Sequence, residues 1–387
     1  MAHSPIAPSS AGIWGAPNGC TGSVKLAALY PEREPSEASR EGDAVHEVGA
    51  HLIEIGLVTS LGVAPRLGVG DVATNGVVIT LDMLAAATMY AEDVLAVARR
   101  ARVFGGPNVG IEQALTMPRI HPESHGTTDS FLYDERHHNL FIWDLKNGYG
   151  VVEPFENWQE INYFEGIMNH LGLDGLDDQK ITVHFRIVQP NAPHREGPIR
   201  GWVTNAADLR GYVNTLHDNA AIALGSNAPL HSGTHCKNCN ARRDCPAAIA
   251  AGLSMYEIAT QTSQVGMTTA QLGAFYRMLI RAEAQIKCLK TGVGAEVEYL
   301  LRHGTNVPGA ALEHKSGNLA WNRPLEEVAA LGDMMGVELR TDKLITPTQA
   351  RAAGLDASLV SAYAGKRQTG AKVVLVDYNN VRKAFTS

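Results

Sequence analysis

The sequence is poor in cysteine, in aromatic residues and in positive charge. Its 387 residues include 5 cysteines, 6% aromatic residues, and 33 lysines and arginines against 40 aspartates and glutamates. Five cysteines, an odd number, do not form a disulfide framework. The formal net charge of -7, with no long basic run, excludes a protein that binds nucleic acid over its whole surface.

Long apolar runs and a targeting pattern are missing as well. The longest apolar stretch, near residues 80–91, is interrupted by Asp82, and it is far shorter than the ~20 residues that a bilayer requires. The N-terminus has neither the basic nor the apolar region of a secretory signal. We therefore expect no membrane span and a cytoplasmic location.

The 45% of hydrophobic residues is enough for a full core in two or three domains. Apolar periodicity predicts helices over residues 39–56, 79–101, 157–171 and 205–224. A period of two predicts strands over residues 109–117, 127–133, 139–146 and 181–189. This order indicates a mixed α/β core and not a doubly wound parallel sheet.

The composition changes after Met255. We expect a long amphipathic helix over residues 268–302, helices that begin near Pro324 and Pro347, and a closing strand over residues 372–377. The predicted organisation is a core over residues 1–254 and a mainly α-helical accessory region over residues 255–387.

Two aspartates stand where a β-hairpin would bring them together. Strand alternation places Asp144 and Lys146 on one face, and a turn centred between Arg136 and His137 would put Asp129 directly across from Asp144. Carboxylates about 5 Å apart on a sheet face repel each other. A divalent cation would remove this conflict, and all-oxygen ligands favour Mg²⁺ or Mn²⁺ over Zn²⁺.

Neighbouring groups fit such a centre. The carbonyl of Leu145 is a candidate oxygen ligand, and Lys146 could steer a water or stabilise charge on a phosphate. Glu112 in the preceding strand and His46 in the first helix are further candidate ligands.

A purely structural alternative stays open for the hairpin. In that case Asp129 caps a turn near Gly126, and Asp144 and Lys146 form a solvated pair at a strand end.

Together, these motifs resemble the PD-(D/E)XK nucleases of the RecB-like branch in order and spacing. The resemblance is carried by His46, Glu112, Gly126-Thr127-Thr128-Asp129, Asp144-Leu145-Lys146 and Gln159-x-x-x-Tyr163. A closer likeness, to an uncharacterised phage and prophage group, rests on Cys20-Thr21-Gly22-Ser23 and on the segment from Glu41 to His46. The resemblance implies a restriction-endonuclease-like core, a mixed central sheet flanked by helices.

The resemblance also implies roles for single residues. Asp129 and Asp144 would bind the metal ions, with His46 and Glu112 as further ligands, and Lys146 would assist the attacking water. Gln159 and Tyr163, four residues apart on one helix face, would orient the site and the DNA.

The cysteines match the iron-sulfur subgroup of these nucleases, which includes the four-cysteine exonuclease associated with CRISPR systems and one subunit of AddAB. By this resemblance Cys20, Cys236, Cys239 and Cys245 would hold a [4Fe-4S] cluster that staples the two ends of the core. Zinc is the chemical rival for four thiolates. Cys288 is expected to be a buried core residue.

The implied function is a metal-dependent DNA nuclease, an exonuclease that resects DNA ends for phage recombination in the cytoplasm of a bacterial host cell. Implied partners are DNA, a phage recombinase or single-strand annealing protein, and a second copy in a homo-oligomer. A non-catalytic DNA-binding or assembly protein is the main alternative, and an RNA-directed enzyme is a third. Because the net charge is negative, DNA would need a local basic groove, with candidates Arg99, Arg100, Arg102, Arg195, Arg200, Arg242 and Arg243.

Overall fold

The protein is described by a computed structural model over residues 4–30, 35–58, 67–173, 178–261, 266–321, 325–339 and 346–375. The chain divides into two compact units, Met1–Thr291 and Gly292–Ser387. The division falls inside one long helix, α8 (Thr269–Arg302), and not at the expected position after residue 254. Because one helix runs through the division, the sequence pattern does not change there.

The first unit is built on a mixed five-stranded sheet. Its strands lie in the order of the chain: β1 (Val109–Thr116), β2 (His125–Asp134), β3 (Asn139–Leu145), β4 (Thr182–Val188) and β5 (Ile199–Asn205). Neighbouring strands are antiparallel except for β3 and β4, which are parallel. The expectation of a mixed α/β fold is confirmed.

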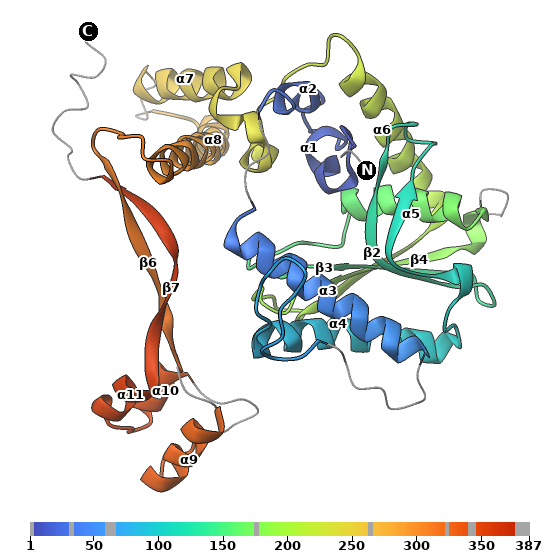
Figure 1. Ribbon diagram of the computed structural model, residues 1–387. Coiled ribbons are helices and arrows are strands. Elements are labelled where there is room, and N and C mark those ends of the chain that lie inside the picture. The colour runs from blue at the N-terminus through green and yellow to red at the C-terminus, as the bar shows by residue number, and fades with distance from the viewer. Residues whose placement is uncertain are drawn as a thin grey trace. The chain divides into compact units, whose positions relative to one another are not determined.

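Helices cover both faces of this sheet (Figure 1). One face carries α3 (Glu37–Val58) and α4 (Leu81–Ala101), and the other carries α5 (Trp158–His170) and α6 (Ala206–Leu224). Because side chains alternate along a strand, Ile142 packs in the core beside α5 and α6, whereas its neighbour Trp143 packs in the core beside α3 and α4.

Smaller helices complete the first unit. They are α1 (Ala11–Trp14), α2 (Ser23–Ala27), α7 (Pro246–Gln261) and the 3-10 turns Pro8–Ser10, Gly106–Asn108, Asp178–Lys180, Thr234–Asn238 and Asn240–Arg243. Both α1 and α2 contact α6, so the N-terminal segment packs on the same side of the sheet as α5 and α6.

Polar caps fix where the main helices begin. Thr80 accepts a hydrogen bond from the amide of Met83 at the start of α4. Asn157 accepts from the amides of residues 159 and 160 at the start of α5, and Asn205 accepts from the amide of Asp208 at the start of α6. Each cap satisfies amide groups that the first helical turn leaves without partners.

The strand β5 was not predicted, since the sequence pattern indicates no element between the strand over residues 181–189 and the helix that begins at residue 205. It pairs with β4 along its whole length. As an edge strand it has one neighbour in the sheet, and its residues show no regular alternation of buried and exposed positions. The period of two by which strands are recognised is therefore absent there.

The second unit contains a long antiparallel hairpin of β6 (Ala310–Trp321) and β7 (Ala364–Leu375), together with α9 (Leu325–Met335), α10 (Pro347–Ala352) and α11 (Ala357–Tyr363). The expected final strand thus begins earlier than residue 372. The partner β6 was missed because its pairing shifts register twice, between His314 and Leu319, which breaks the alternation. Pro347 begins α10 as expected, whereas Pro324 and residues 376–377 lie outside the described residues.

The small core of this unit is formed by buried apolar residues of its helices, of the loops after α9 and α10, and of the first residue of β7. They are Val328, Leu331, Leu339, Ala350, Leu355, Val360 and Ala364.

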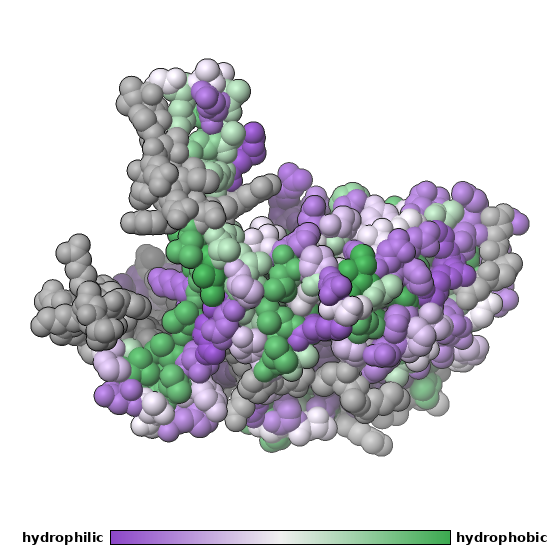
Figure 2. Space-filling view, turned by 90° about the horizontal axis from the view of Figure 1, so that it is seen from above, coloured by the Kyte–Doolittle hydropathy of each residue, from purple (hydrophilic) through white to green (hydrophobic). Residues whose placement is uncertain are grey.

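In the described part of the chain no helix is long and apolar enough to cross a membrane. Figure 2 shows hydrophobic residues at the surface in patches between hydrophilic ones. Within the first unit, large exposed apolar side chains occur on α7 and α8, among them Leu253, Leu272, Tyr276 and Ile280.

Candidate active site

Acidic residues from three neighbouring strands meet near one end of the sheet. Ser130 on β2 pairs with Trp143 on β3, which is the register that the sequence predicts and which sets Asp129 opposite Asp144. On the other side of β2, the pairs that flank position 112 set Glu112 of β1 opposite Asp129. A row of three carboxylates therefore crosses the strands β1, β2 and β3.

The backbone at Glu112 is unusual. Its φ of +44° lies in the left-handed region, which residues other than glycine seldom adopt. The ladder between β1 and β2 omits position 112, although Ile111 and Gln113 on either side are both paired. Such strained positions cost about 1–3 kcal/mol each and concentrate at functional sites.

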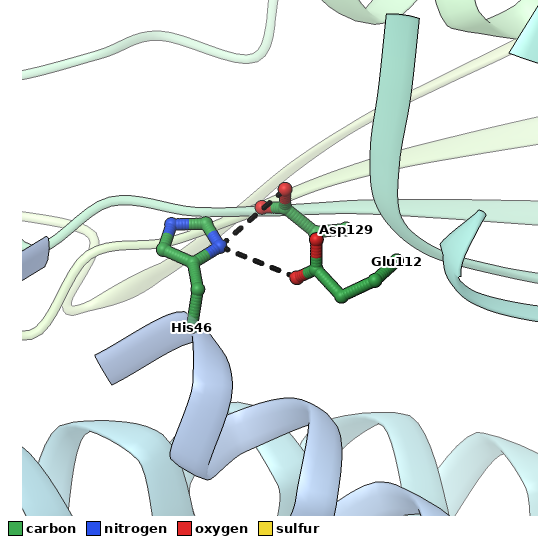
Figure 3. Close-up of side chains that lie close together, drawn as sticks. All are labelled: His46, Glu112 and Asp129. Atoms are coloured by element: carbon green, nitrogen blue, oxygen red, sulfur yellow. Dashed lines mark ion pairs between the residues drawn. The ribbon is translucent and has the colours of Figure 1, made fainter. Parts of the chain in front are cut away.

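His46 reaches this row of acids from α3 (Figure 3). Its Nδ1 lies 3.5 Å from Asp129 Oδ1 and 3.7 Å from Glu112 Oε1. One ligand atom from each of the three side chains lies within 4.8 Å of the others, so the three could hold one metal ion. The close approach of α3 is allowed by Gly49, one turn after His46, because a Cβ there would come within 2.8 Å of the Tyr90 ring.

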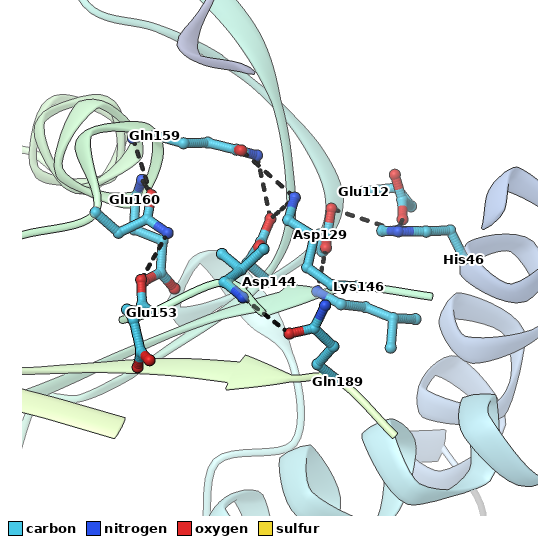
Figure 4. Close-up of polar contacts among 12 residues, drawn as sticks. His46, Glu112, Asp129, Asp144, Lys146, Glu153, Gln159, Glu160 and Gln189 are labelled. Atoms are coloured by element: carbon cyan, nitrogen blue, oxygen red, sulfur yellow. Dashed lines mark hydrogen bonds and ion pairs between the residues drawn. The ribbon is translucent and has the colours of Figure 1, made fainter. Parts of the chain in front are cut away.

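A second set of contacts surrounds Asp144 (Figure 4). Its Oδ1 accepts hydrogen bonds from Lys146 Nζ at 2.8 Å and from Gln159 Nε2 at 3.1 Å. The other oxygen, Oδ2, is buried and has no hydrogen-bond partner among the described residues. A buried carboxylate oxygen with unused lone pairs is a suitable ligand for a cation.

Two further contacts hold Asp129 in place. The backbone N–H of Leu145 donates to Asp129 Oδ2 at 2.7 Å, which ties the two strands together at the site. Next to Asp129, Ser130 Oγ accepts a hydrogen bond at 2.8 Å from the buried Tyr90 hydroxyl on α4. Leu145 thus takes part through its N–H, while its carbonyl as a metal ligand stays a prediction.

The site holds strongly perturbed titratable groups. Burial alone would lower the pKa of His46, but the charge of Asp129 and the hydrogen bond and charge of Glu112 outweigh it and raise that pKa to about 9. Burial raises the pKa of Asp129 to about 7, against the charge of His46 and with the help of the charge of Asp144. Without a cation, the carboxylates are therefore compensated by a protonated imidazole and by bound protons.

Lys146 stays charged in this surrounding. Burial acts to lower its pKa, but the charge and the hydrogen bond of Asp144 raise it above its ordinary value. An ammonium group with a raised pKa is a poor base and a good electrostatic partner for an anion.

Gln159 and Tyr163 come to the site from the first turns of α5. Gln159 bridges Asp144 and Lys146, because its Oε1 accepts a hydrogen bond from Lys146 Nζ at 3.4 Å. Tyr163 is buried and shares a hydrogen bond with Gln159; burial and the charges of Asp129 and Asp144 raise its pKa. The structure thus brings both residues beside the acids.

Glu160 is a site residue that sequence reasoning missed. It follows Gln159 on α5 and is fully buried. Burial and the charge of Asp144 raise its pKa well above the ordinary value, against the charge of Lys146. Its position was readable, because the helical period puts Glu160 beside Ile161 and Phe164 on the buried face of α5, where an acid is rare.

The cysteines gather in another part of the first unit, and all five are buried. Cys20, three residues before α2, accepts a hydrogen bond from the amide of His231, so the N-terminal segment meets the later cysteine segment. The charges of Cys20, Cys236 and Cys245 all act on the pKa of Cys239, which burial raises.

No three sulfur atoms of the described residues lie within 4.8 Å of one another. The four thiols that the sequence predicts to be ligands are close together but do not enclose a single-ion centre. Cys288 on α8 is buried, as expected, and the charges of Cys236, Cys239 and Cys245 act on its pKa, which burial raises.

One candidate for the basic groove is wrong. Arg200 is buried within β5, where it donates hydrogen bonds to Gln189 Oε1 at 2.6 Å and to the carbonyl of Val152 at 2.7 Å. Its guanidinium therefore serves internal structure and does not face solvent. Arg99 and Arg100, in the last turn of α4, are exposed, and the side chain of Arg195 is 88% exposed.

The chain matches a protein family. No curated protein and no solved structure matches the chain. A family described as "Protein of unknown function (DUF2800)" matches residues 3–365, nearly the whole sequence. The chain is a member of the DUF2800 family.

Proposed function

We propose that the chain is a DNA nuclease that depends on Mg²⁺ or Mn²⁺ and has a core of the PD-(D/E)XK type. The observation that carries this proposal is the row of Glu112, Asp129 and Asp144 across three strands, with His46 at one end and Lys146 at the other. A structural hairpin gains nothing from adjacent carboxylates, because like charges opposite each other destabilise a sheet.

The residues fit a divalent cation. Asp144 Oδ2 is a buried oxygen with no partner among the described residues, and His46, Glu112 and Asp129 present ligand atoms within 4.8 Å of one another. Oxygen ligands with one imidazole suit Mg²⁺ or Mn²⁺. A bound cation would supply Lewis-acid polarisation of the phosphate and would lower the pKa of a water.

The protein groups have separate tasks. Lys146, held as an ammonium by Asp144, places positive charge where charge develops on a phosphate in the transition state. Gln159 fixes both groups through its amide, so that the carboxylate and the ammonium keep one geometry. The backbone N–H of Leu145 restrains Asp129 from the neighbouring strand, and the Tyr90 hydroxyl restrains the adjacent Ser130 from α4.

The biological role proposed with this activity is exonucleolytic resection of DNA ends for phage recombination, in the bacterial cytoplasm. A recombinase or single-strand annealing protein would receive the resulting single strands, and the nuclease would act as a homo-oligomer or as a single chain. These assignments rest on the likeness to the RecB-like nucleases.

A [4Fe-4S] cluster at Cys20, Cys236, Cys239 and Cys245 is part of the proposal, with zinc as the rival occupant. Burial of all four thiols and the contact of the Cys20 segment with His231 support a metal centre that joins both ends of the core. Such a centre would stabilise the fold and would stand apart from hydrolysis.

The test is digestion of end-labelled linear DNA and of covalently closed circular DNA with Mg²⁺ or Mn²⁺. We expect the wild type to degrade the linear substrate and Asp144→Asn to leave it intact. Glu135→Ala removes an exposed carboxylate from the turn of the same hairpin and should behave like the wild type. Binding without degradation by the wild type would replace the nuclease with the DNA-binding or assembly protein.

A further inference from the structure

Hydrogen bonds from a single side chain hold the segment that follows Lys146 at every second residue from 148 to 152. One buried side chain, Gln189 at the end of β4, donates through Nε2 to the carbonyl of Gly148 at 2.9 Å and to that of Gly150 at 2.8 Å. Its Oε1 accepts from the amide of Val152 at 3.0 Å. A single amide therefore holds three points of this segment.

Two more side chains complete the attachment. Asn191 donates to the carbonyl of Asn147 at 3.0 Å, and the buried Arg200 donates to the carbonyl of Val152 at 2.7 Å. Residues 147, 148, 150 and 152 are thus bonded to the region between β4 and β5. The segment is fixed in one shape, although it contains two glycines.

Tyr149 lies between two of the fixed points and turns outward. It is 78% exposed, while the carbonyls of Gly148 and Gly150 on either side are both bound by Gln189. The backbone of the segment is ordered before any ligand binds. A ligand that stacks on this exposed ring would therefore lose little binding free energy to the ordering of the loop.

Tyr149 is also close to the reaction centre. It is three residues from Lys146, so their Cα atoms are at most about 11 Å apart. DNA advances about 3.4 Å per nucleotide along a strand, so a tyrosine at this distance lies within a few nucleotides of a phosphate bound at Lys146.

The charges of the segment favour a base over a phosphate as its ligand. Residues 147–157 contain Glu153 and Glu156 and no lysine or arginine. A phosphate contact would need positive charge there, whereas stacking on an aromatic ring needs none.

We propose that Tyr149 is a stacking platform for a nucleobase of the DNA strand that enters the site. This proposal rests on the nuclease function given above and assigns a substrate contact to it. Gln189 is the positioning residue that holds the platform.

The test compares affinities in a Lys146→Met background, which slows cleavage strongly and keeps the acidic residues. The probe is a single strand that carries 2-aminopurine near its end, followed by fluorescence with Mn²⁺. We expect Tyr149→Ala to weaken binding about 5- to 150-fold and to abolish the quenching of the base. Tyr149→Phe should keep both, and Tyr276→Ala, an exposed tyrosine on α8, should change neither.

Salt dependence gives a second readout. Loss of stacking should leave the slope of log Kd against log salt unchanged, because the phosphate contacts remain. Equal affinity of Tyr149→Ala and its parent, or a reduced slope, would overturn the platform while cleavage by the wild type upholds the nuclease. A wild type that neither binds nor cleaves DNA would overturn both.

Discussion

Lys146 Nζ lies 2.8 Å from Asp144 Oδ1, while Asp144 Oδ2 is buried without a hydrogen-bond partner among the described residues. Only one of the two Asp144 oxygens therefore has a hydrogen-bond partner among the described residues. A buried oxygen without a partner indicates a position where a ligand could bind. A purely structural ion pair at a strand end would leave both groups in solvent, whereas Asp144 is only 2% exposed.

Replacement of Lys146 by methionine removes the charge of the side chain and keeps most of its volume. We expect the rate of DNA cleavage to fall by about 10² to 10³, because one donor to the developing charge is lost. Thermal unfolding should show that the fold is retained. Lys180→Met, at the surface turn before β4, is the matched control and should keep full activity. An active Lys146→Met protein would contradict the assigned site.

Metal affinity should rise with pH. His46 is protonated below about pH 9 in the metal-free protein, and a metal ligand must be neutral, so binding has to displace this proton. Asp129, with its pKa raised to about 7 by burial, adds to this effect below neutral pH. Calorimetry of Mn²⁺ binding in buffers of different ionisation enthalpy should show proton release. A His46→Ala protein should release fewer protons, and equal release by both would refute the role of His46.

The stability of the metal-free protein should fall as the pH rises. The raised pKa of His46 means that its contribution is complete below its unfolded value of 6.5 and is lost as the pH approaches 9. The raised pKa of Asp129 acts in the same direction between its unfolded value of 3.8 and about 7. Thermal unfolding in EDTA from pH 5 to pH 9 tests this, and excess Mn²⁺ should remove much of the trend.

The cysteine site should contain iron. Protein purified without oxygen should be brown, with broad absorption near 400 nm, and Cys20→Ser should lose both the colour and thermal stability. Cys288→Ser should retain the colour, because Cys288 lies outside the four expected ligands. A colourless wild type with one zinc per chain would establish the rival metal.

Gln189→Leu should destabilise the protein by about 1–3 kcal/mol, because it removes one acceptor of the buried Arg200 and leaves two carbonyls without their donor. Urea unfolding measures this loss. Asn191→Ala removes a more peripheral contact of the same segment and should cost less. Equal stability of Gln189→Leu and the wild type would show that the segment is held by its backbone.

Much of the site could be predicted because its residues are close in sequence. The hairpin of β2 and β3 closes over a short turn, so counting residues sets Asp129 opposite Asp144. Gln159 and Tyr163 share a face by the helical period. Thr80, Asn157 and Asn205 cap the starts of α4, α5 and α6, and such a cap acts on amides only two or three residues further along the chain.

What escaped prediction depends on contacts between distant segments. Arg200 looked like a surface cation and is buried, because β5 pairs with β4 and its guanidinium meets Gln189. The helical period puts Glu160 on the buried face of α5, but the effect of Asp144 on its pKa follows only from the packing of α5 on the sheet. Tyr149 became a candidate only through the amide of residue 189, forty positions away.

The sequence by itself determined the order of the first four strands of the sheet and of the four main helices around them, the register of the central hairpin and the identity of the acids, because periodicity and short turns are local properties of a chain. The tertiary structure alone decided which carboxylates meet the imidazole of α3, which of the acids are buried, and which aromatic side chain is left exposed beside Lys146. Burial and long-range hydrogen bonds are properties of the packed chain. They set the pKa values of the site residues and decide which polar atoms are left without a hydrogen-bond partner.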